Sequence, residues 1–308
     1  MKGSFSIGVV GAGATGGYLA AVLANANYPV TIVARGQSRE RIAQQGLIIE
    51  RPGDSLILAK PAKVVEPGET TEPVDVVLFC VKSYDTDAAL SGIDGLMGKN
   101  GRVLCLQNGV VNEDTLTKRF GSQRVISGVM YIGSERTAPG CIRVNTPARV
   151  FFGSPEPSNQ RLIEQLKAAF DAAGVECSVN ERILTDKWQK FFFNCGLNPL
   201  TAIVGMKLGA ILGREEGKIL FEALIDEAIA VANKAGAPLA ADARDRVLDT
   251  ARRMDISSSM AEDLASGRPI ERDAFTGHVR RLGETLGVST PVTAVFDQLL
   301  ALKSAKAG

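Results

Sequence analysis

Three polar side chains recur every four residues in the segment KWQKFFFNCGLNPLTA at 187–202, namely Lys190, Asn194 and Asn198, and between 190 and 200 no other side chain is polar. Residues four apart lie on one face of a helix, one turn above another. Such a stripe could protonate an oxygen through its ammonium group and hold a small polar ligand through its amides. A solvent-facing stripe is the alternative, although asparagine is a poor helix former and hydrated faces are usually wider. Pro199 cannot donate a helical hydrogen bond, so the helix should bend or end there.

A glycine-rich motif, GAGATG, directly follows an apolar strand pattern and opens a helical pattern. This G-x-G-x-x-G spacing between a strand and a helix predicts dinucleotide binding. Gly11 permits the tight turn, Gly13 lets the backbone approach a pyrophosphate, and Gly16 lets the helix pack closely on the strand. The helix N-terminus then offers N–H groups to the phosphates. The candidate cofactor-binding residues of the motif are Gly11, Ala12, Gly13, Ala14, Thr15 and Gly16. A glycine-rich turn that binds no ligand is the alternative.

The second predicted strand ends in TIVARGQS, which places Arg35 where NAD-binding proteins usually carry an acidic residue. A guanidinium group suits a 2′-phosphate through paired, charge-assisted hydrogen bonds. The sequence therefore predicts NADP(H) as the cofactor, unless Arg35 is an ordinary surface arginine.

Two further polar residues, Lys82 in VKSYDT and Asn108 in LQNGV, each follow a predicted strand. Ligands of doubly wound sheets bind at the carboxyl ends of the strands. Taken singly, either residue could equally just end its strand.

The elements that position these residues alternate between strand and helix in the first half of the chain. Near-continuous runs of Val, Ile, Leu and Phe are typical of parallel strands covered on both faces. The predicted strands of this kind span residues 5–10, 30–34, 74–81 and 101–106, and an alanine-rich helix spans 15–26. Their order predicts an α/β fold with an N-terminal Rossmann-type doubly wound sheet.

Other segments extend the sheet before the strand patterns stop. Residues 46–65 predict a hairpin that turns at Pro52-Gly53-Asp54. Residues 124–153 predict two or three strands of an antiparallel extension, and a helix at 159–173 and a short strand VECSV follow. From about residue 181 only helical patterns remain. We therefore predict an NADP-binding domain over 1–179 and an all-α substrate and catalytic domain over 180–308.

The composition of the 308-residue chain is that of a soluble globular protein of about two domains. Its formal net charge of +1 provides no overall field for nucleic acid or anionic lipid, and no apolar run reaches transmembrane length. We therefore expect no nucleic-acid or membrane partner. The five cysteines include no CxxC pair and are typical of buried free thiols in a reducing compartment, which predicts a cytoplasmic location.

The chain has one histidine, His278, within the charged stretch GHVRRLGE, and we expect it at the surface. A single histidine excludes His-rich metal sites, and no metal is expected. Proton transfer must then rely on a lysine or a carboxylate.

The set of motifs resembles the ketopantoate reductase (2-dehydropantoate 2-reductase) family over nearly the whole chain. The resemblance rests on GAGATG with Arg35, VKSYDT with Lys82, LQNGV with Asn108, KWQKFFFNCGLNPLTA, and SSSMAEDLASGRPIE with Ser259 and Glu271. It implies NADPH-dependent reduction of 2-dehydropantoate, a small 2-keto acid, to (R)-pantoate in pantothenate and coenzyme A biosynthesis. It leaves open a monomer or a homodimer.

The resemblance also implies a role for each matching residue. Lys190 would be the general acid that protonates the ketone oxygen, and Glu271 would lie beside the nicotinamide ribose and orient the substrate or Lys190. The residues expected to bind substrate are Asn108, Asn194, Asn198 and Ser259. The residues expected to contact the cofactor outside the glycine motif are Arg35, Lys82, Asn108 and Glu271.

Two departures from the family pattern concern substrate choice. Ile256 stands where several family members carry a polar amide, and VGMKLG follows Ala202 in place of a segment with an asparagine. A related NADP-dependent reductase of another 2-keto acid is therefore an alternative. A non-catalytic NADP(H)-binding sensor is a second alternative, against which the presence of both Lys190 and Glu271 argues.

Overall fold

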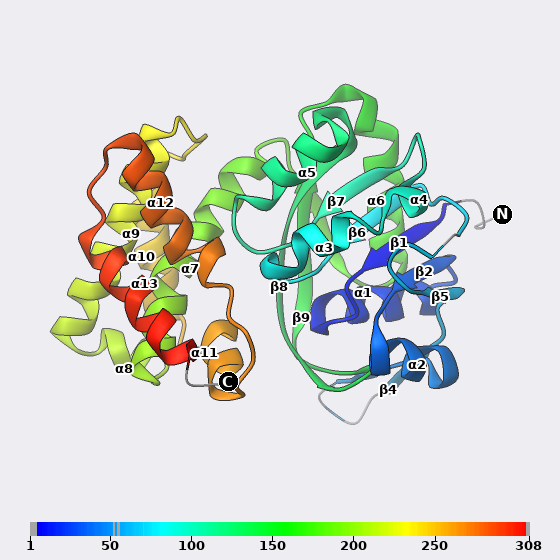
Figure 1. Ribbon diagram of the computed structural model, residues 1–308, viewed down its shortest axis with the longest axis horizontal. Coiled ribbons are helices and arrows are strands. Elements are labelled where there is room, and N and C mark those ends of the chain that lie inside the picture. Colours follow the sequence, from blue (N-terminus) through cyan, green and yellow to red (C-terminus); the bar gives the residue numbers. More distant parts are fainter. Residues whose placement is uncertain (1–4, 52, 54–55, 70, 306–308) are drawn as a thin grey trace. The chain divides into compact units, whose positions relative to one another are not determined.

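The computed structural model describes residues 5–51, 53, 56–69 and 71–305 (Figure 1). The chain divides into two compact units. Unit 1 comprises Met1–Gln107 and Asn112–Ile183, and unit 2 comprises Asn108–Val111 and Leu184–Gly308. The short segment 108–111 thus belongs by its contacts to unit 2, although it lies within the first half of the sequence.

Among the described residues, unit 1 is built on a ten-stranded sheet in the order β4-β3-β9-β8-β7-β6-β1-β2-β5, with β10 paired to β9. The parallel strands are β1 Ile7–Val10, β2 Val30–Val33, β5 Lys63–Val65, β6 Val76–Phe79 and β7 Arg102–Cys105. The remaining strands are β3 Leu47–Glu50, β4 Leu56–Ala59, β8 Val125–Ala138, β9 Cys141–Gly153 and β10 Glu176–Val179. Of these, β3–β4 and β8–β9 are antiparallel pairs, whereas β8 pairs with β7, β3 with β9 and β10 with β9 in parallel. The two long strands β8 and β9 form the predicted antiparallel extension, visible in green in Figure 1.

Helices cover both faces of this sheet, and β1, β2 and β6 are therefore buried at every position. The helices of unit 1 are α1 Ala14–Asn25, α2 Gly36–Gln45, α3 Thr86–Leu90, α4 Asp94–Met97, α5 Asn112–Phe120 and α6 Gln160–Ala172, with the 3-10 turns η1 Ser83–Asp85, η2 Ser122–Arg124 and η3 Pro157–Asn159. One core cluster joins the sheet to α1 and α6, and another joins it to α3, α4 and α5. The predicted doubly wound α/β architecture is confirmed.

The segment around residues 46–65 was only partly predicted. β3 and β4 form the expected antiparallel hairpin. In its turn, Gly53 has a φ of +82°, whereas Pro52 and Asp54 lie outside the described residues. Residues 63–65 leave the hairpin and pair in parallel with β2 as β5. Helix α2 was not predicted, because its mostly polar sequence gives little apolar periodicity.

Among the described residues, the secondary structure of unit 2 consists of helices and includes no strand, as predicted. Its elements are α7 Ile183–Val204, α8 Leu208–Leu212, α9 Glu215–Lys234, α10 Ala243–Arg253, α11 Ser259–Ala265, the 3-10 turn η4 Arg272–Ala274, α12 Thr276–Leu286 and α13 Pro291–Ser304. The core gathers around α7 and α9, where Phe191, Phe192 and Phe221 are buried. Within the described ranges, no helix has the length and apolar character needed to cross a membrane.

The sequence predicted that the helix bends or ends at Pro199, and it does not end there, because α7 continues through Pro199 to Val204. A proline inside a helix costs about 3 kcal/mol. The flanking Leu197 and Leu200 are 4% and 0% exposed. Burial of each leucine side chain contributes about 1.5–3 kcal/mol, so packing offsets the lost backbone hydrogen bond.

All five cysteines are free thiols. Cys105 and Cys195 are buried, as predicted, whereas Cys80, Cys141 and Cys177 are only half-buried.

Candidate functional site

The polar stripe of α7 is not a hydrated face. Asn198 is 5% exposed, and Lys190 and Asn194 are half-buried. The Lys190 ammonium donates a hydrogen bond to Oδ1 of Asn108 at 2.9 Å. Two residues that are 82 positions apart in the sequence, both within unit 2, are therefore in direct contact.

The environment of Lys190 changes its acidity. Burial, and to a smaller extent the charge of Lys187, lower the pKa of Lys190, and the Glu271 carboxylate opposes both effects, which leaves a pKa of about 7. Burial penalises the charged form of a lysine, and a nearby carboxylate favours it. Lys190 can thus give up and take back a proton near neutral pH, which is the property of a general acid.

Lys187 was missed as a contributor to the site. It lies one helical turn before Lys190 and is 4% exposed. The i, i+3 spacing of the two lysines in KWQK was the available signal, because residues three apart are neighbours on a helix.

Aromatic side chains isolate this part of α7 from water. The Phe191 ring stacks on Phe275 at 5.9 Å between centroids and meets His278 edge-on at 5.9 Å. The prediction that His278 is a surface residue is wrong, because α12 turns the imidazole half-buried toward that ring. Burial, with a smaller contribution from Arg281, lowers the pKa of His278 to about 4. The imidazole is neutral at pH 7 and is no proton donor there.

Glu271 precedes η4 and is 6% exposed, and its charge acts on Lys190. Lys190, Asn108 and Glu271 are thus brought together from three separate segments of unit 2.

The far end of the stripe meets the start of α11. Thr201, one residue beyond the NPL turn of α7, shares a 2.7 Å hydrogen bond with Ser258. Ser258 caps α11 by accepting a hydrogen bond from the Ala261 N–H at 3.1 Å. Ser259 follows with an exposed side chain, whereas Ser258 is 2% exposed. Ser258 is therefore the buried helix cap, and Ser259 is the serine whose hydroxyl is exposed.

The two departures from the family pattern lie side by side. The N–H of Leu208, in the segment after Ala202, donates to the carbonyl oxygen of Ile256 at 2.9 Å. Ile256 itself is 40% exposed.

In unit 1, the glycine turn between β1 and α1 has the form that a dinucleotide requires. Gly11 has a φ of +107°, in the region that favours glycine. A Cβ on Gly16 would lie 2.0 Å from the Gly11 carbonyl oxygen, so only glycine allows α1 this close to the strand. A Cβ on Gly13 would meet nothing within 4 Å, and Gly13 is the N-cap of α1. This open space beside free helix N–H groups fits a pyrophosphate.

Arg35 follows β2 and begins α2 as its N-cap residue. Its guanidinium is paired with the carboxylate of Asp85 at 3.3 Å, and both side chains are largely exposed, at 57% and 41%. Arg39 is paired in turn with Glu66 and Glu69 at 3.6 and 3.8 Å. The sequence had not indicated that Arg35 has a carboxylate partner from the segment after β6.

The loop that carries Lys82 is held by Gln107, a buried residue at the end of β7. The Gln107 side-chain amide donates to the Val81 carbonyl oxygen at 3.0 Å and to Oγ1 of Thr86 at 2.8 Å. Lys82 is half-buried and its carbonyl accepts from the Asp85 N–H at 2.9 Å. Gln107 therefore fixes both ends of the VKSYDT loop.

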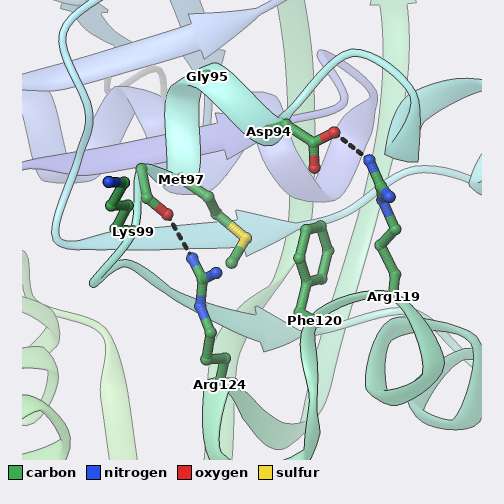
Figure 2. Close-up of a pocket in the computed structure, with 8 residues that line it drawn as sticks. Asp94, Gly95, Met97, Lys99, Arg119, Phe120 and Arg124 are labelled. Atoms are coloured by element: carbon green, nitrogen blue, oxygen red, sulfur yellow. Dashed lines mark hydrogen bonds and ion pairs between the residues drawn. The ribbon is translucent and has the colours of Figure 1, made fainter.

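A cavity of about 370 Å³ in unit 1 contains none of these residues. It is lined by α4, Gly98, Lys99, Arg119, Phe120 and Arg124, and Figure 2 shows the Arg119 guanidinium turned toward Asp94. Arg119 is paired with Asp94, and Arg124 donates to the carbonyls of Gly98 and Gly101 at 2.6 and 2.9 Å. Since both arginines already have partners and the cavity contains none of the predicted site residues, this cavity is not the candidate site. In the described part of the chain, no cluster of His, Cys, Asp and Glu could hold a metal ion.

A doubly wound unit with a glycine-built phosphate turn, joined to a helical unit with a buried lysine, defines a two-domain dinucleotide-binding class. Two family models match the chain: "Ketopantoate reductase PanE/ApbA" over residues 7–157 and "Ketopantoate reductase PanE/ApbA C terminal" over 182–304. The chain belongs to the ketopantoate reductase PanE/ApbA family, which confirms the resemblance found in the sequence.

Relatives match over the full length. A 2-dehydropantoate 2-reductase of Caulobacter vibrioides is 34% identical over 300 residues, which cover 96% of this chain and 98% of that protein. The crystal structure of a PanE/ApbA family ketopantoate reductase from Ralstonia eutropha has a TM-score of 0.89 and 32% identity, and covers 98% of this chain and 99% of its own. A D-mandelate dehydrogenase with NADH and anilino(oxo)acetate has a TM-score of 0.90 at 21% identity over 98% and 99% of the two chains, which shows the shared fold alone.

Proposed function

We propose that this protein reduces 2-dehydropantoate to (R)-pantoate with NADPH, as a step of pantothenate and coenzyme A biosynthesis. The observation that carries the proposal is Lys190, an ammonium group with a pKa of about 7 that is hydrogen-bonded to Asn108 and influenced by Glu271. Family membership and the relatives named 2-dehydropantoate 2-reductase support the substrate. The expected location is the cytoplasm, and the expected assembly is a monomer or a homodimer.

The two parts of the chain would divide the work. Residues 1–179 would bind the cofactor, with the glycine turn at the pyrophosphate, Arg35 at the 2′-phosphate and Lys82 nearby. Residues 180–308 would bind and protonate the substrate. When bound, NADPH supplies the hydride that reduces the keto carbon.

Lys190 would donate its proton to the oxygen of the reacting carbonyl, where negative charge develops. Asn108 would hold the ammonium in place through the 2.9 Å hydrogen bond. Glu271 would favour the protonated form of Lys190, because its carboxylate raises the pKa that burial lowers. All three residues would therefore act on the same proton, the one that the Lys190 ammonium gives to the carbonyl oxygen.

The substrate groups away from the reacting carbon need hydrogen-bond donors. Asn194 and Asn198 would bind the hydroxyl and carboxylate groups from successive turns of α7, and Ser259 would bind the carboxylate end through its exposed hydroxyl. These amide and hydroxyl groups supply donors without adding a second buried charge.

Reduction of a different 2-keto acid is a second candidate, favoured by one observation. Ile256 and the segment after Ala202 replace polar residues of the family pattern and contact each other through their backbones. An apolar surface there would accept a substrate whose side chain lacks a hydroxyl.

The test is NADPH oxidation by the purified protein with 2-dehydropantoate and a panel of other 2-keto acids, including pyruvate, 2-oxoisovalerate and benzoylformate. The proposal expects the highest kcat/KM with 2-dehydropantoate. A tenfold or greater preference for another acid would replace the substrate and keep the reaction type. NADPH binding without turnover of any acid would instead favour the sensor.

A further inference from the structure

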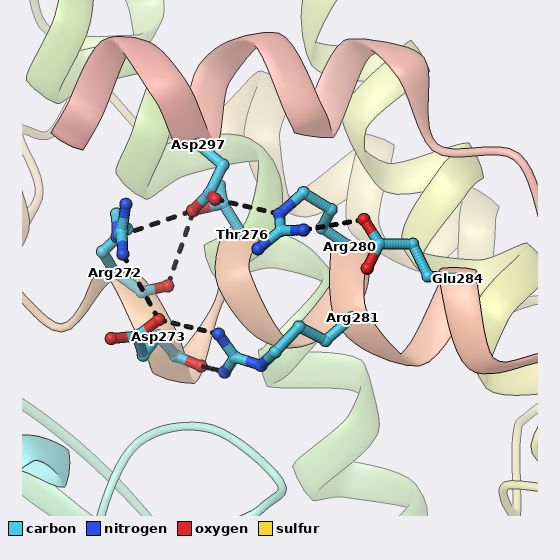
Figure 3. A network of polar contacts seen from close by, with 7 residues as sticks. All are labelled: Arg272, Asp273, Thr276, Arg280, Arg281, Glu284 and Asp297. Atoms are coloured by element: carbon cyan, nitrogen blue, oxygen red, sulfur yellow. Dashed lines mark hydrogen bonds and ion pairs between the residues drawn. The ribbon is translucent and has the colours of Figure 1, made fainter. Parts of the chain in front are cut away.

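A buried carboxylate on α13, Asp297, receives donors from the elements that follow Glu271 (Figure 3). Asp297 is 4% exposed. Thr276 Oγ1 donates to it at 2.9 Å, and the Nε atoms of Arg280 and Arg272 lie 3.1 and 3.7 Å from its two oxygens. Three side chains from η4 and α12 thus converge on one acid of α13.

Stabilisation of α13 does not require this carboxylate. The helix already buries Phe296 and Leu300 in the core of unit 2. Its first N–H groups, of Val292 and Thr293, donate to the Glu227 carboxylate at 2.9 and 2.8 Å. A buried ion pair adds little net stability, because removing both charges from water offsets their attraction. The placement of Asp297 is better explained by the geometry it imposes.

The residues that Asp297 contacts belong to the turn at Glu271. Arg272 is the next residue in the chain, and its carbonyl oxygen accepts from the Phe275 N–H at 3.1 Å and from Thr276 Oγ1 at 3.5 Å. The Glu271 carbonyl accepts from the Ala274 N–H at 3.2 Å. Asp297 therefore holds this hydrogen-bonded turn at Arg272 and at Thr276.

The other side of the same turn is fixed to α7. Phe275 stacks on Phe191, the residue directly after Lys190. The turn is thus held between an aromatic stack on the Lys190 helix and a carboxylate on α13.

We propose that Asp297 is a positioning residue that holds Glu271 near Lys190 through Arg272 and Thr276. Its effect on catalysis rests on the proposed function, whereas its effect on Lys190 does not. The family pattern discussed above assigns no role to residues 272–297.

The charged groups around Lys190 determine how its pKa should change if Glu271 is displaced. Lys187 lowers the pKa of Lys190 and Glu271 raises it, while Asn108 accepts a hydrogen bond from the ammonium. His278, beside Phe191, is neutral above a pH of about 4. If Glu271 moves away, the attraction that favours the ammonium form of Lys190 weakens. The pKa of Lys190 should then fall.

The experiment is an NMR titration of the protein with ¹³C-labelled lysine side chains, in which the Lys190 resonance is assigned by its loss in Lys190→Ala. Asp297→Asn keeps the shape and one acceptor but removes the charge. Arg272→Met breaks the link next to Glu271, together with the Arg272–Asp273 pair, and leaves Asp297 paired with Arg280. Both variants should lower the pKa of Lys190 by about half a unit or more, a shift within the range that one displaced charge produces.

Two variants serve as controls. Glu284→Gln removes the exposed Arg280–Glu284 pair, which is 2.7 Å long, and should change nothing. Arg280→Met removes the Asp297 partner that lies farther along the chain from Glu271, and should lower Tm with the Lys190 titration unchanged. With the best keto acid, Asp297→Asn and Arg272→Met should lower kcat several-fold without weakening NADPH binding.

Two results would overturn the inference. One is a folded Arg272→Met with the wild-type Lys190 titration. The other is an Arg280→Met that shifts Lys190 as much as Arg272→Met, since the network would then act through general stability. The titration needs no substrate and therefore tests this inference independently of catalysis. If the protein reduced no keto acid, the proposed function would be refuted, and the NMR titration would still decide whether Asp297 positions Glu271.

Discussion

The glycine turn of unit 1 and the polar stripe of α7 are two different ways of building a site. The turn works through its backbone, because what matters at Gly13 is that a Cβ there would meet no protein atom within 4 Å. The stripe works through side chains: the acidity of Lys190 depends on burial and on the charges of Lys187 and Glu271, and its ammonium donates a hydrogen bond to Asn108. A backbone site is therefore encoded within six consecutive residues, whereas a side-chain site depends on segments far apart in the sequence.

The comparison predicts the largest effect at the stripe. Lys190→Ala should lower kcat by about a hundredfold or more, which is the loss expected for a general acid. NADPH binding, measured by fluorescence titration, should stay within about twofold because the cofactor residues are unchanged. Asn108→Ala, which removes only the hydrogen-bond acceptor of Lys190, is the graded comparison. An unchanged kcat in Lys190→Ala would remove this residue from the mechanism.

The pH dependence of kcat/KM in the wild-type protein should report the ionisation of Lys190. Reduction needs the protonated ammonium, and burial lowers the pKa of Lys190 to about 7. Above that pH, kcat/KM for the keto acid should fall by up to about tenfold per pH unit. Lys187→Met should move this fall to higher pH, since it removes a neighbouring positive charge. A profile that stays flat to pH 9 would show that Lys190 keeps an ordinary lysine pKa.

The same contrast explains how much could be predicted. Strands such as β1 and β6 were predicted because continuous apolar runs are a local property, and GAGATG because its glycines stand at fixed spacing. The 3.3 Å pair between Arg35 and Asp85 was not predicted, because it joins residues 50 positions apart. His278 was misplaced for the same reason, since its burial against Phe191 depends on how α12 packs on α7. The roles of the candidate site residues stay predictions.

A change at the glycine turn should affect the cofactor without affecting the fold. Gly13→Val places a side chain in space that is open in the protein, where the pyrophosphate is expected. NADPH should bind about 30-fold more weakly, equivalent to about 2 kcal/mol, with Tm unchanged. Gly95→Val, at a helical position where a Cβ also meets nothing within 4 Å, is the matched control and should leave NADPH binding intact. Equal binding by Gly13→Val would mean that the phosphates lie elsewhere.

Arg35 combines the two kinds of site. Its side chain would bind the 2′-phosphate of a cofactor whose pyrophosphate is bound by the backbone of the glycine turn. Arg35→Ala should weaken NADPH about tenfold and NADH hardly at all, as expected for one charge-assisted contact to the 2′-phosphate. Arg39→Ala removes a nearby arginine that already has two carboxylate partners, and serves as the control. Equal losses for both cofactors would show that Arg35 does not read the 2′-phosphate.

The smallest expected effect concerns the carboxylate that is paired with Arg35. The Arg35–Asp85 pair is exposed, and exposed pairs contribute only about 0–1 kcal/mol. A 2′-phosphate that approaches Arg35 must share it with Asp85 and is repelled by the same carboxylate. Asp85→Asn should therefore tighten NADPH by about threefold at low salt, less at high salt, and leave NADH unchanged. Weaker NADPH binding in this variant would instead mean that Asp85 orients Arg35, and that even this exposed side-chain contact depends on a distant segment for its geometry.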